Sequence, residues 1–309
     1  MQIIGLRHPQ EPYTLRECGL VLGNFDGVHR GHRALIDELK RLNAKRSPRL
    51  PLGALCFSEH PSYTLGEGVP RLCSNEEKME IFRRAGLQFV IFCSFPDLMH
   101  LSPEAFVRDI LVNICHCRMA VCGYNYTFGA KGAGKAEDLA RLLQESGADA
   151  SIVAPVTDGR HVISSTVIRD MLERGHPEDA ARLLGRPYTL TGKVARGKHV
   201  GRVMGFPTAN LTFDAKQVIP AHGVYAVTVK IGRRSYFGIS NIGTRPTFQD
   251  GDHVTCETFL FEFNGDLYGK TLQVCFLHFL REERPFANQS ALQAQIERDI
   301  ATAREYLNF

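Results

Sequence analysis

The sequence has little that would place the chain in a membrane or outside the cell. Its longest apolar run, residues 89–93, has the length of a strand, whereas a membrane-spanning helix needs roughly 18 residues. The first residues, MQIIGLRHPQEPY, lack the basic start and apolar core of a signal peptide. The 9 cysteines are odd in number, which fits buried thiols in a reducing compartment better than a disulfide framework. We therefore expect a cytoplasmic protein with no membrane partner.

A strong charge of either sign is also missing. Lys and Arg number 37 against 33 Asp and Glu, a formal net charge of +4 at pH 7. Without a basic stripe, this balance predicts no nucleic-acid partner, and it suits a protein that handles phosphorylated small molecules. The chain has no internal repeat, and its 309 residues, 44% of them hydrophobic, predict about two globular domains. The sequence leaves a homo-oligomer open.

The first half of the chain alternates short apolar runs with helical patterns, which predicts a doubly wound parallel α/β sheet. Ser74 and Glu77 form a capping-box pattern and Ser102 precedes a proline, so helices are expected to begin at both places. Such sheets bind ligands beyond the carboxyl ends of their strands. Strands are predicted over residues 19–23, 52–57, 88–93, 119–122 and 151–156, and another helix over residues 33–46.

The pattern of predicted elements changes after Arg186 and Pro187. From there on, strand-like runs follow one another with turns between them. Residues 264–266, Asn-Gly-Asp, are a strong hairpin turn, and Leu292, Ile296 and Ile300 predict a closing helix after Ser290. We predict domains at 1–185 and 186–309, the second an antiparallel barrel or sandwich, with the β-barrel favoured. Its expected strands are 189–194, 224–231, 235–239, 254–263 and 271–277.

Two histidines lie between the first predicted strand and the first long helix. His29 and His32 are three residues apart, so on a helical start they share one face and can donate hydrogen bonds to a triphosphate. Glycines permit close backbone approach, and the helix N-terminus carries a partial positive charge. We predict catalytic roles for both histidines. Phosphate or nucleotide contacts are predicted at Gly23, Phe25, Asp26, Gly27 and Gly31.

This pattern resembles the nucleotidylyltransferase superfamily, which shares its fold with class I aminoacyl-tRNA synthetases. A second, hydroxyl-rich signature binds phosphates in that superfamily, and residues 163–169 fit it. Hydroxyls at a helix start with a following arginine can hold a phosphate, although an ordinary helix cap is the alternative. The phosphate contacts predicted here are Ser164, Ser165, Thr166 and Arg169.

A glycine-rich loop with aromatic residues, 123–134, follows the fourth strand and is suited to stacking on a planar ring. The segment 57–61 ends the second strand on the same rim. We predict contacts with a phosphate or a planar ring at His60, Asn125, Tyr126 and Phe128.

The second half carries hard oxygen ligands and a basic glycine-rich segment. Thr208 and Asn210 are two residues apart, so in an extended segment they point to the same side and suit Mg²⁺. Gly192, Lys198 and Gly205 belong to a segment that we predict to cover phosphates as a flap. A solvated basic hairpin is the alternative on charge pattern alone.

Several motifs, taken in their order along the chain, are specific enough to indicate a family. Residues 23–32 (G-x-F-D-G-x-H-x-G-H), 57–61 (F-x-x-H-P), 123–129 (G-x-N-Y-x-F-G) and 163–169 (I-S-S-T-x-I-R) resemble the N-terminal module of bacterial bifunctional riboflavin kinase/FAD synthetases. Residues 205–210 (G-F-P-T-A-N), 240–248, 266–270 and 279–286 resemble riboflavin kinase. The resemblance implies FMN adenylyltransferase and riboflavin kinase activities, with riboflavin, FMN, ATP and Mg²⁺ as substrates and cofactor and FAD as product. It also implies that Glu257 is the kinase's catalytic glutamate and that Arg281 lies in a flavin-binding motif. In the N-terminal module it implies flavin or FMN contacts at His60, Asn125, Tyr126 and Phe128.

The chemistry of the two implied reactions explains why one half of the chain offers a glutamate and the other offers histidines. The 5′-hydroxyl of riboflavin must lose a proton as it attacks ATP, which a carboxylate such as Glu257 can accept. The phosphate of FMN is already ionised, so its adenylylation needs charge stabilisation and no general base. Two alternatives remain: another small-molecule nucleotidylyltransferase, which would leave the second half unexplained, and a non-catalytic flavin-responsive binding module.

Overall fold

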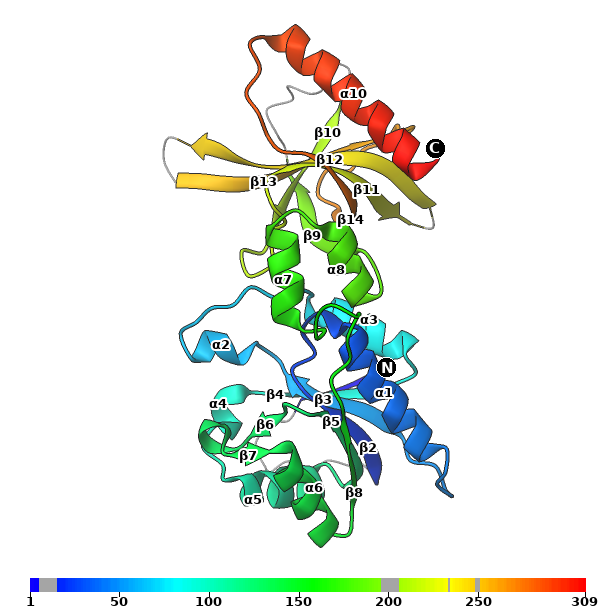
Figure 1. Ribbon diagram of the computed structural model, residues 1–309, viewed down its shortest axis with the longest axis vertical. Helices are drawn as coiled ribbons and strands as arrows, with labels where there is room; N and C mark the ends of the chain where they lie inside the picture. Colours follow the sequence, from blue (N-terminus) through cyan, green and yellow to red (C-terminus); the bar gives the residue numbers. More distant parts are fainter. Residues whose placement is uncertain (6–15, 196–205, 233, 248–250) are drawn as a thin grey trace. The chain divides into compact units, whose positions relative to one another are not determined.

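A parallel sheet and a closed barrel form the two units of the computed structural model, which describes residues 1–5, 16–195, 206–232, 234–247 and 251–309. By their contacts the units are Met1–Ser165 and Thr166–Phe309. Both predicted architectures are confirmed (Figure 1). The contacts group residues 166–185 with the barrel, and the functional boundary predicted at residues 185 and 186 stays a prediction.

Six parallel strands form the sheet of the first unit in the order β1-β4-β3-β2-β5-β8. From the central strand β2 the chain adds β3 and then β4 on one side of the sheet, and afterwards β5 and then β8 on the other side. The switch point therefore lies between β2 and β5, where ligands of such sheets bind. The strands are β1 (Gln2–Gly5), β2 (Cys18–Leu22), β3 (Leu52–Phe57), β4 (Phe89–Cys93), β5 (Cys117–Gly123) and β8 (Asp149–Val153).

Helices cover both faces of this sheet. Leu35, Ile36 and Leu39 of α1 and Phe82 of α3 are buried on one face, while η2 and α6 cover the other. The capping box of Ser74 and Glu77 is present, and Ser102 caps the helix that begins at Pro103 by accepting the N–H of Ala105 at 3.1 Å. The helical elements are η1 (Asp26–Val28), α1 (Arg30–Asn43), α2 (Pro61–Thr64), α3 (Asn75–Arg84), α4 (Phe95–Leu98), α5 (Pro103–Ala105), the π-helix η2 (Phe106–Ile114), η3 (Ala130–Gly132) and α6 (Ala136–Glu145). A small hairpin pairs β6 (Thr127–Phe128) with β7 (Gly134–Lys135).

In the second unit, six antiparallel strands close a barrel in the order β10-β13-β12-β11-β14-β9. Residues alternate in and out along each strand, so Cys256 and Thr258, both buried, face the interior and Glu257 faces outward. The strands are β9 (Tyr188–Ala195), β10 (Thr208–Phe213), β11 (Gly223–Ile231), β12 (Arg234–Thr247), β13 (Gly251–Leu260) and β14 (Thr271–Arg281). Two helices precede the barrel, α7 (Ser165–Glu173) and α8 (Pro177–Leu184).

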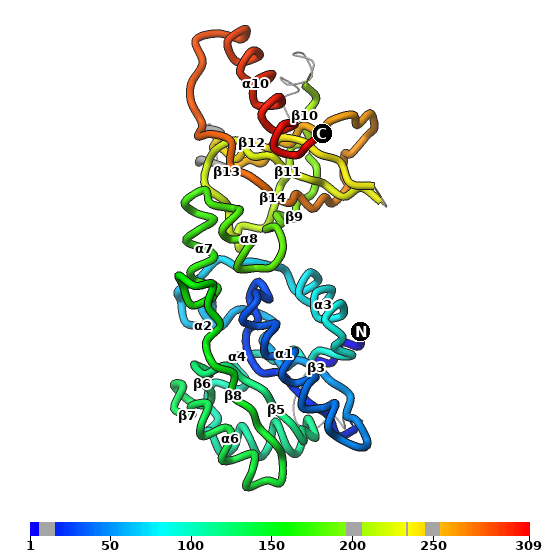
Figure 2. The backbone as a smooth tube through the Cα atoms, turned by 45° about the vertical axis from the view of Figure 1, so that its right-hand side comes forward, coloured from blue at the N-terminus to red at the C-terminus, as the bar shows by residue number. Residues whose placement is uncertain are grey.

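The closing helix α10 (Gln289–Leu307) lies along the outside of the barrel, beside β11 and β12, in both views (Figures 1 and 2). Its Ile296, Ile300 and Ala303 pack against a patch that includes Val224 and Ile239. The helix therefore covers the outer face of the barrel at β11 and β12.

All nine cysteines lie in the described part of the chain and are free thiols. Eight are buried, as predicted, and Cys275 is half-buried. Burial raises the pKa of the Cys117 thiol to about 12, so this thiol stays protonated near neutral pH. Among the described helices, none combines the length and the apolar content that crossing a bilayer requires.

Candidate functional sites

Two imidazole rings stack where the chain leaves the central strand β2. The ring centroids of His29 and His32 are 3.6 Å apart, with an angle of 18° between the rings. His29 caps helix α1, because its Nδ1 accepts the backbone N–H of His32 at 3.3 Å. A neutral His29 therefore carries its proton on Nε2, which leaves that nitrogen as the donor.

The backbone before the histidines is held in an unusual shape. Phe25 and Gly27 both have left-handed φ angles, of 54° and 76°. The Asp26 carboxylate accepts the N–H of Leu72 at 2.9 Å, and the Asp26 carbonyl accepts the hydroxyl of Ser165 at 2.9 Å. The two predicted phosphate signatures, far apart in the sequence, thus meet at Asp26.

Gly31 leaves room for the His29 ring. A Cβ at Gly31 would lie 3.1 Å from the His29 ring and 3.4 Å from the carbonyl oxygen of Ile163. At Gly23 a Cβ would come no closer than 3.4 Å to the Phe25 ring, an ordinary contact. Both glycines were predicted to contact phosphate, and of the two only Gly31 approaches the ring of a histidine closely.

His32 is kept neutral by its surroundings. Burial, then the charges of His29 and Lys78, hold the pKa of His32 well below its ordinary value of 6.5. The buried Nδ1 of His32 has no hydrogen-bond partner among the residues that the structure describes. A neutral imidazole with an unused polar atom is suited to meeting a ligand.

Lys78 is a residue of this site that the sequence analysis missed. It lies on α3, is 5% exposed, and its Nζ donates to the backbone carbonyl of Asn24 at 3.0 Å. The available signal was its position four residues before the buried Phe82, since a charged residue on the apolar face of a helix is unusual.

The predicted flavin contacts in this unit have different environments. His60 caps α2, with its Nδ1 2.7 Å from the Ser62 hydroxyl. Asn125 is exposed and Tyr126 half-buried, and Tyr126 stacks on Phe128 at 5.8 Å between ring centroids. Phe128 is buried against Phe106 in the core, so its side chain has a packing role, while its flavin contact stays a prediction.

The other predicted phosphate residues are divided among the parts of the chain. Ser164 ends the first unit with Ser165, while Thr166 and the buried Arg169 begin the second on α7. Gly192 lies on β9, where a Cβ would meet the carbonyl of Thr212 at 2.8 Å, so this glycine permits close strand packing. Lys198 and Gly205 lie outside the described residues.

The barrel brings Thr208, Asn210 and Glu257 together on its outer face. Asn210 of β10 stands opposite Glu257 of β13, and Glu257 stands opposite Asn241 of β12. The Thr208 hydroxyl donates to a Glu257 carboxylate oxygen at 3.4 Å. The predicted Mg²⁺ ligands and the predicted catalytic glutamate thus form one cluster across adjacent strands.

A cavity of about 550 Å³ adjoins this cluster. Thr208 and Asn210 line it, together with Asp266, Leu267 and Tyr268 from the turn after β13. The buried Oδ1 of Asn210 has no hydrogen-bond partner within the described ranges. A hydroxyl, an amide oxygen and a nearby carboxylate are the hard ligands that Mg²⁺ prefers, so these residues fit that ion.

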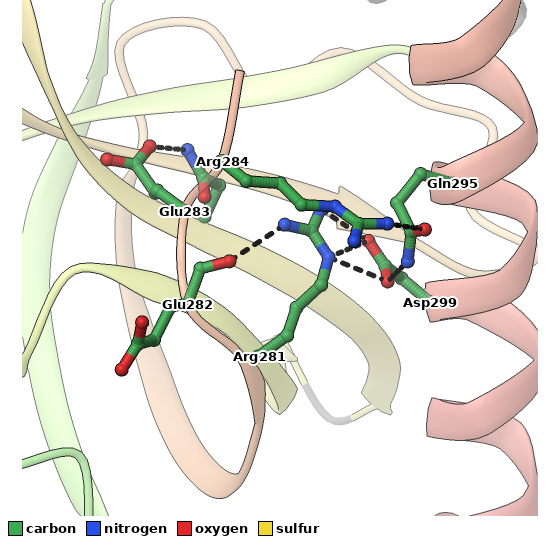
Figure 3. Close-up of polar contacts among 7 residues, drawn as sticks. Arg281, Glu282, Glu283, Arg284, Gln295 and Asp299 are labelled. Carbon is green, nitrogen blue, oxygen red and sulfur yellow. Dashed lines mark hydrogen bonds and ion pairs between the residues drawn. The ribbon is translucent and has the colours of Figure 1, made fainter. Parts of the chain in front are cut away.

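Arg281, the predicted flavin contact of the barrel, is tied to helix α10 (Figure 3). Its Nε and Nη2 donate to the Asp299 carboxylate at 2.8–3.1 Å, and its Nη1 donates to the Glu282 carbonyl at 2.9 Å. Gln295 donates to Asp299 at 2.7 Å and also meets Arg284. Arg281 therefore fastens the helix to the barrel, and its flavin contact stays a prediction.

The amide of Asn241 donates to the carboxylate of Glu283, on the segment after β14, at 2.9 Å. Because Asn241 stands opposite Glu257, this bond ties the segment after β14 to the strand beside the proposed base.

The class defined by this fold and these sites is a two-module enzyme of phosphoryl and nucleotidyl transfer. The riboflavin kinase family model matches residues 184–307, and the FAD synthetase family model matches residues 11–167.

Whole relatives match as well. The chain is 35% identical to a bifunctional riboflavin kinase/FMN adenylyltransferase of Listeria monocytogenes, covering 99% of this chain and 98% of the relative. The Escherichia coli K12 enzyme of the same description is 36% identical, over 94% of this chain and 92% of the relative. A solved structure described as a macrolide-efflux protein from Streptococcus pneumoniae is 30% identical with a TM-score of 0.90, covering 98% of this chain and 99% of that one.

The chain belongs to the family of bifunctional riboflavin kinases/FMN adenylyltransferases. Its C-terminal module is a riboflavin kinase, which forms FMN, and its N-terminal module is the FAD synthetase, which adenylylates FMN. The function predicted from the sequence is confirmed.

Proposed function

We propose that the two activities use separate sets of side chains, one on each module. For the kinase, Glu257 accepts the proton of the riboflavin 5′-hydroxyl as it attacks the terminal phosphorus of ATP. The observation that supports this role is the cluster of Thr208, Asn210 and Glu257 beside the cavity.

Thr208 and Asn210 would hold Mg²⁺ in this proposal. The ion would neutralise phosphate charge when bound. The protein's own contribution is to orient the two oxygen ligands on β10 and to hold Glu257 next to them, because the Thr208 hydroxyl contacts its carboxylate.

For adenylyl transfer, His29, His32, Ser165 and Arg169 supply hydrogen bonds and charge to the phosphates. His29 donates through Nε2, since its Nδ1 is already an acceptor in the cap of α1. No general base is needed, because the attacking FMN phosphate is ionised at neutral pH. Asn125, Tyr126 and His60 are proposed to contact the flavin of FMN.

A pair of variants tests the separation of the two sites. Glu257→Gln is expected to lower FMN formation by about 10²-fold or more and to leave adenylylation of supplied FMN unchanged. His29→Asn is expected to do the reverse, because asparagine can still cap α1 but lacks the imidazole donor. Glu262→Gln, just after β13 and exposed, is the control. If either variant loses both activities while remaining folded, the two-site proposal is wrong.

We also propose a cellular location, a set of substrates and the limits of the two domains. Nine free thiols support a reducing, cytoplasmic location. The substrates are riboflavin, FMN and ATP, with no nucleic-acid partner, in keeping with the net charge of +4. Domain limits at 1–185 and 186–309 are supported on the kinase side by the family match that begins at residue 184.

A further inference from the structure

Lys78 carries a positive charge on a buried side chain. It is 5% exposed, and no carboxylate forms an ion pair with it among the residues that the structure describes. Its Nζ donates to a neutral acceptor, the carbonyl of Asn24. Burying an ammonium group in this way is costly unless a negative charge compensates it. The described residues supply no such charge, so a bound anion would stabilise Lys78.

The surroundings of Lys78 show where that anion would lie. Asn24 belongs to the loop between β2 and α1, and Phe82, one turn after Lys78, packs edge-on against Phe25 at 5.3 Å. Phe25 in turn packs against the His32 ring at 5.1 Å. Lys78 is also close enough to lower the pKa of His32. The ammonium group and the two imidazoles therefore surround the same loop.

Helix α3 is held firmly in this position. Its capping residue Ser74 follows Leu72 and Cys73, which bind the loop through the Asp26 carboxylate and the Gly27 N–H. The lysine is thus presented to the loop by a fixed helix, as expected of a residue that meets a ligand in a defined place.

We propose that Lys78 is a phosphate-binding residue of the adenylyltransferase site, and that its ammonium group is neutralised by a phosphate of the bound substrates. This inference rests on the proposed placement of adenylyl transfer at His29 and His32. ATP and FMN both bring phosphate groups to that site, and the experiment below separates them.

The test compares Lys78→Met, which keeps the length and apolar stem but removes the charge, with Lys78→Arg, which keeps the charge. The matched control is Lys40→Met, because Lys40 also donates to a backbone carbonyl, that of Ala85 at 3.2 Å, but is exposed. FMN adenylylation is measured in the full-length protein with FMN and ATP varied separately, and riboflavin phosphorylation serves as the internal reference.

Lys78→Met is expected to raise the KM for ATP or for FMN by about ten- to a hundredfold, the value of one charge-assisted hydrogen bond. The substrate whose KM rises identifies the phosphate. Lys78→Arg should recover much of the loss, while Lys40→Met and the kinase reaction should not change. Since the variant removes an uncompensated charge, the first unit should be no less stable without ligands, as measured by hydrogen exchange.

Two outcomes would overturn the inference. One is an unchanged KM for both substrates in Lys78→Met. The other is faster hydrogen exchange throughout the first unit of Lys78→Met together with a lowered kcat, which would show that Lys78 stabilises the fold and does not bind phosphate. If His29→Asn and His32→Asn both keep full adenylylation, the placement of the site fails instead, so the two failures are distinguishable.

Discussion

Asn210 and Glu257 stand directly opposite each other on β10 and β13, with the Thr208 hydroxyl 3.4 Å from the carboxylate of Glu257. This register places an amide oxygen, a hydroxyl and a carboxylate on one patch of the barrel's outer face. Opposed residues of antiparallel strands have Cβ atoms about 5 Å apart, so neighbouring strands suffice to gather the patch without any loop.

Asn210→Ala should weaken the use of Mg²⁺ by the kinase alone. The Mg²⁺ concentration for half-maximal FMN formation is expected to rise about tenfold or more, the effect of losing about 1.4 kcal/mol of ligand binding. Adenylylation of supplied FMN should keep its Mg²⁺ dependence. Magnesium titrations of both reactions check this, and equal shifts in the two would contradict the assignment of Asn210.

Gly31→Ala should damage adenylylation without unfolding the module. Alanine in a helix is favoured over glycine by about 1 kcal/mol, but here its Cβ would press on the His29 ring at 3.1 Å. A misplaced His29 is expected to lower the rate of FAD formation by about 10²-fold, with riboflavin phosphorylation unchanged. Rates of both reactions, with circular dichroism of the variant, are the measurement; full FAD formation would show that His29 tolerates displacement.

Acid should destabilise the first unit through His32. Because the native pKa of His32 lies well below 6.5, the unfolded chain takes up a proton below pH 6.5 that the native state refuses. Stability is therefore lost as the pH falls below 6.5, by up to about 1.4 kcal/mol per pH unit until the native pKa is reached. His32→Gln should lack this contribution. Hydrogen exchange of α1 in both proteins at pH 7.5 and 5.5, corrected for intrinsic rates, is the test; equal pH sensitivity would refute it.

Asp299→Ala should loosen α10. It removes the buried partner of Arg281: the Asp299 side chain is 5% exposed and the Arg281 side chain 20%. We expect a loss of about 2–3 kcal/mol, somewhat below the cost of breaking a fully buried pair. Asp170→Ala is the control, because its i,i+4 pair with Arg174 is exposed and should cost less than about 0.5 kcal/mol. Urea unfolding followed by circular dichroism measures both, and similar losses would contradict the prediction.

How far the sequence predicts the structure depends on whether the signal is local. Strand β3 was predicted with its observed bounds, 52–57, because a buried central strand is a continuous apolar run. The edge strand β1 was missed, since three of its four residues are exposed and it has no apolar pattern. A helix was predicted after Ser102 and begins there, but its continuation as the π-helix η2 was not predicted, because the hydrogen-bond shift leaves no mark in the periodicity.

The functional residues, too, were predictable only where a local sequence pattern marks them. Motif spacing predicted that His29 and His32 lie together, and they do. No local pattern states that Lys78, on another helix, reaches the same loop, or that Arg281 is held by Asp299, 18 residues further along the chain. Such contacts depend on tertiary packing, which a linear pattern does not contain.

The barrel's closure also bears on how such an enzyme can change over evolutionary time. Its interior is filled by residues such as Cys256 and Thr258, whereas Glu257 between them points outward. Selection can therefore alter the chemistry of the outer patch, one alternate residue at a time, without opening a void in the interior that folding depends on. A kinase built in this way can lose or retune its activity and still remain a folded neighbour to the adenylyltransferase.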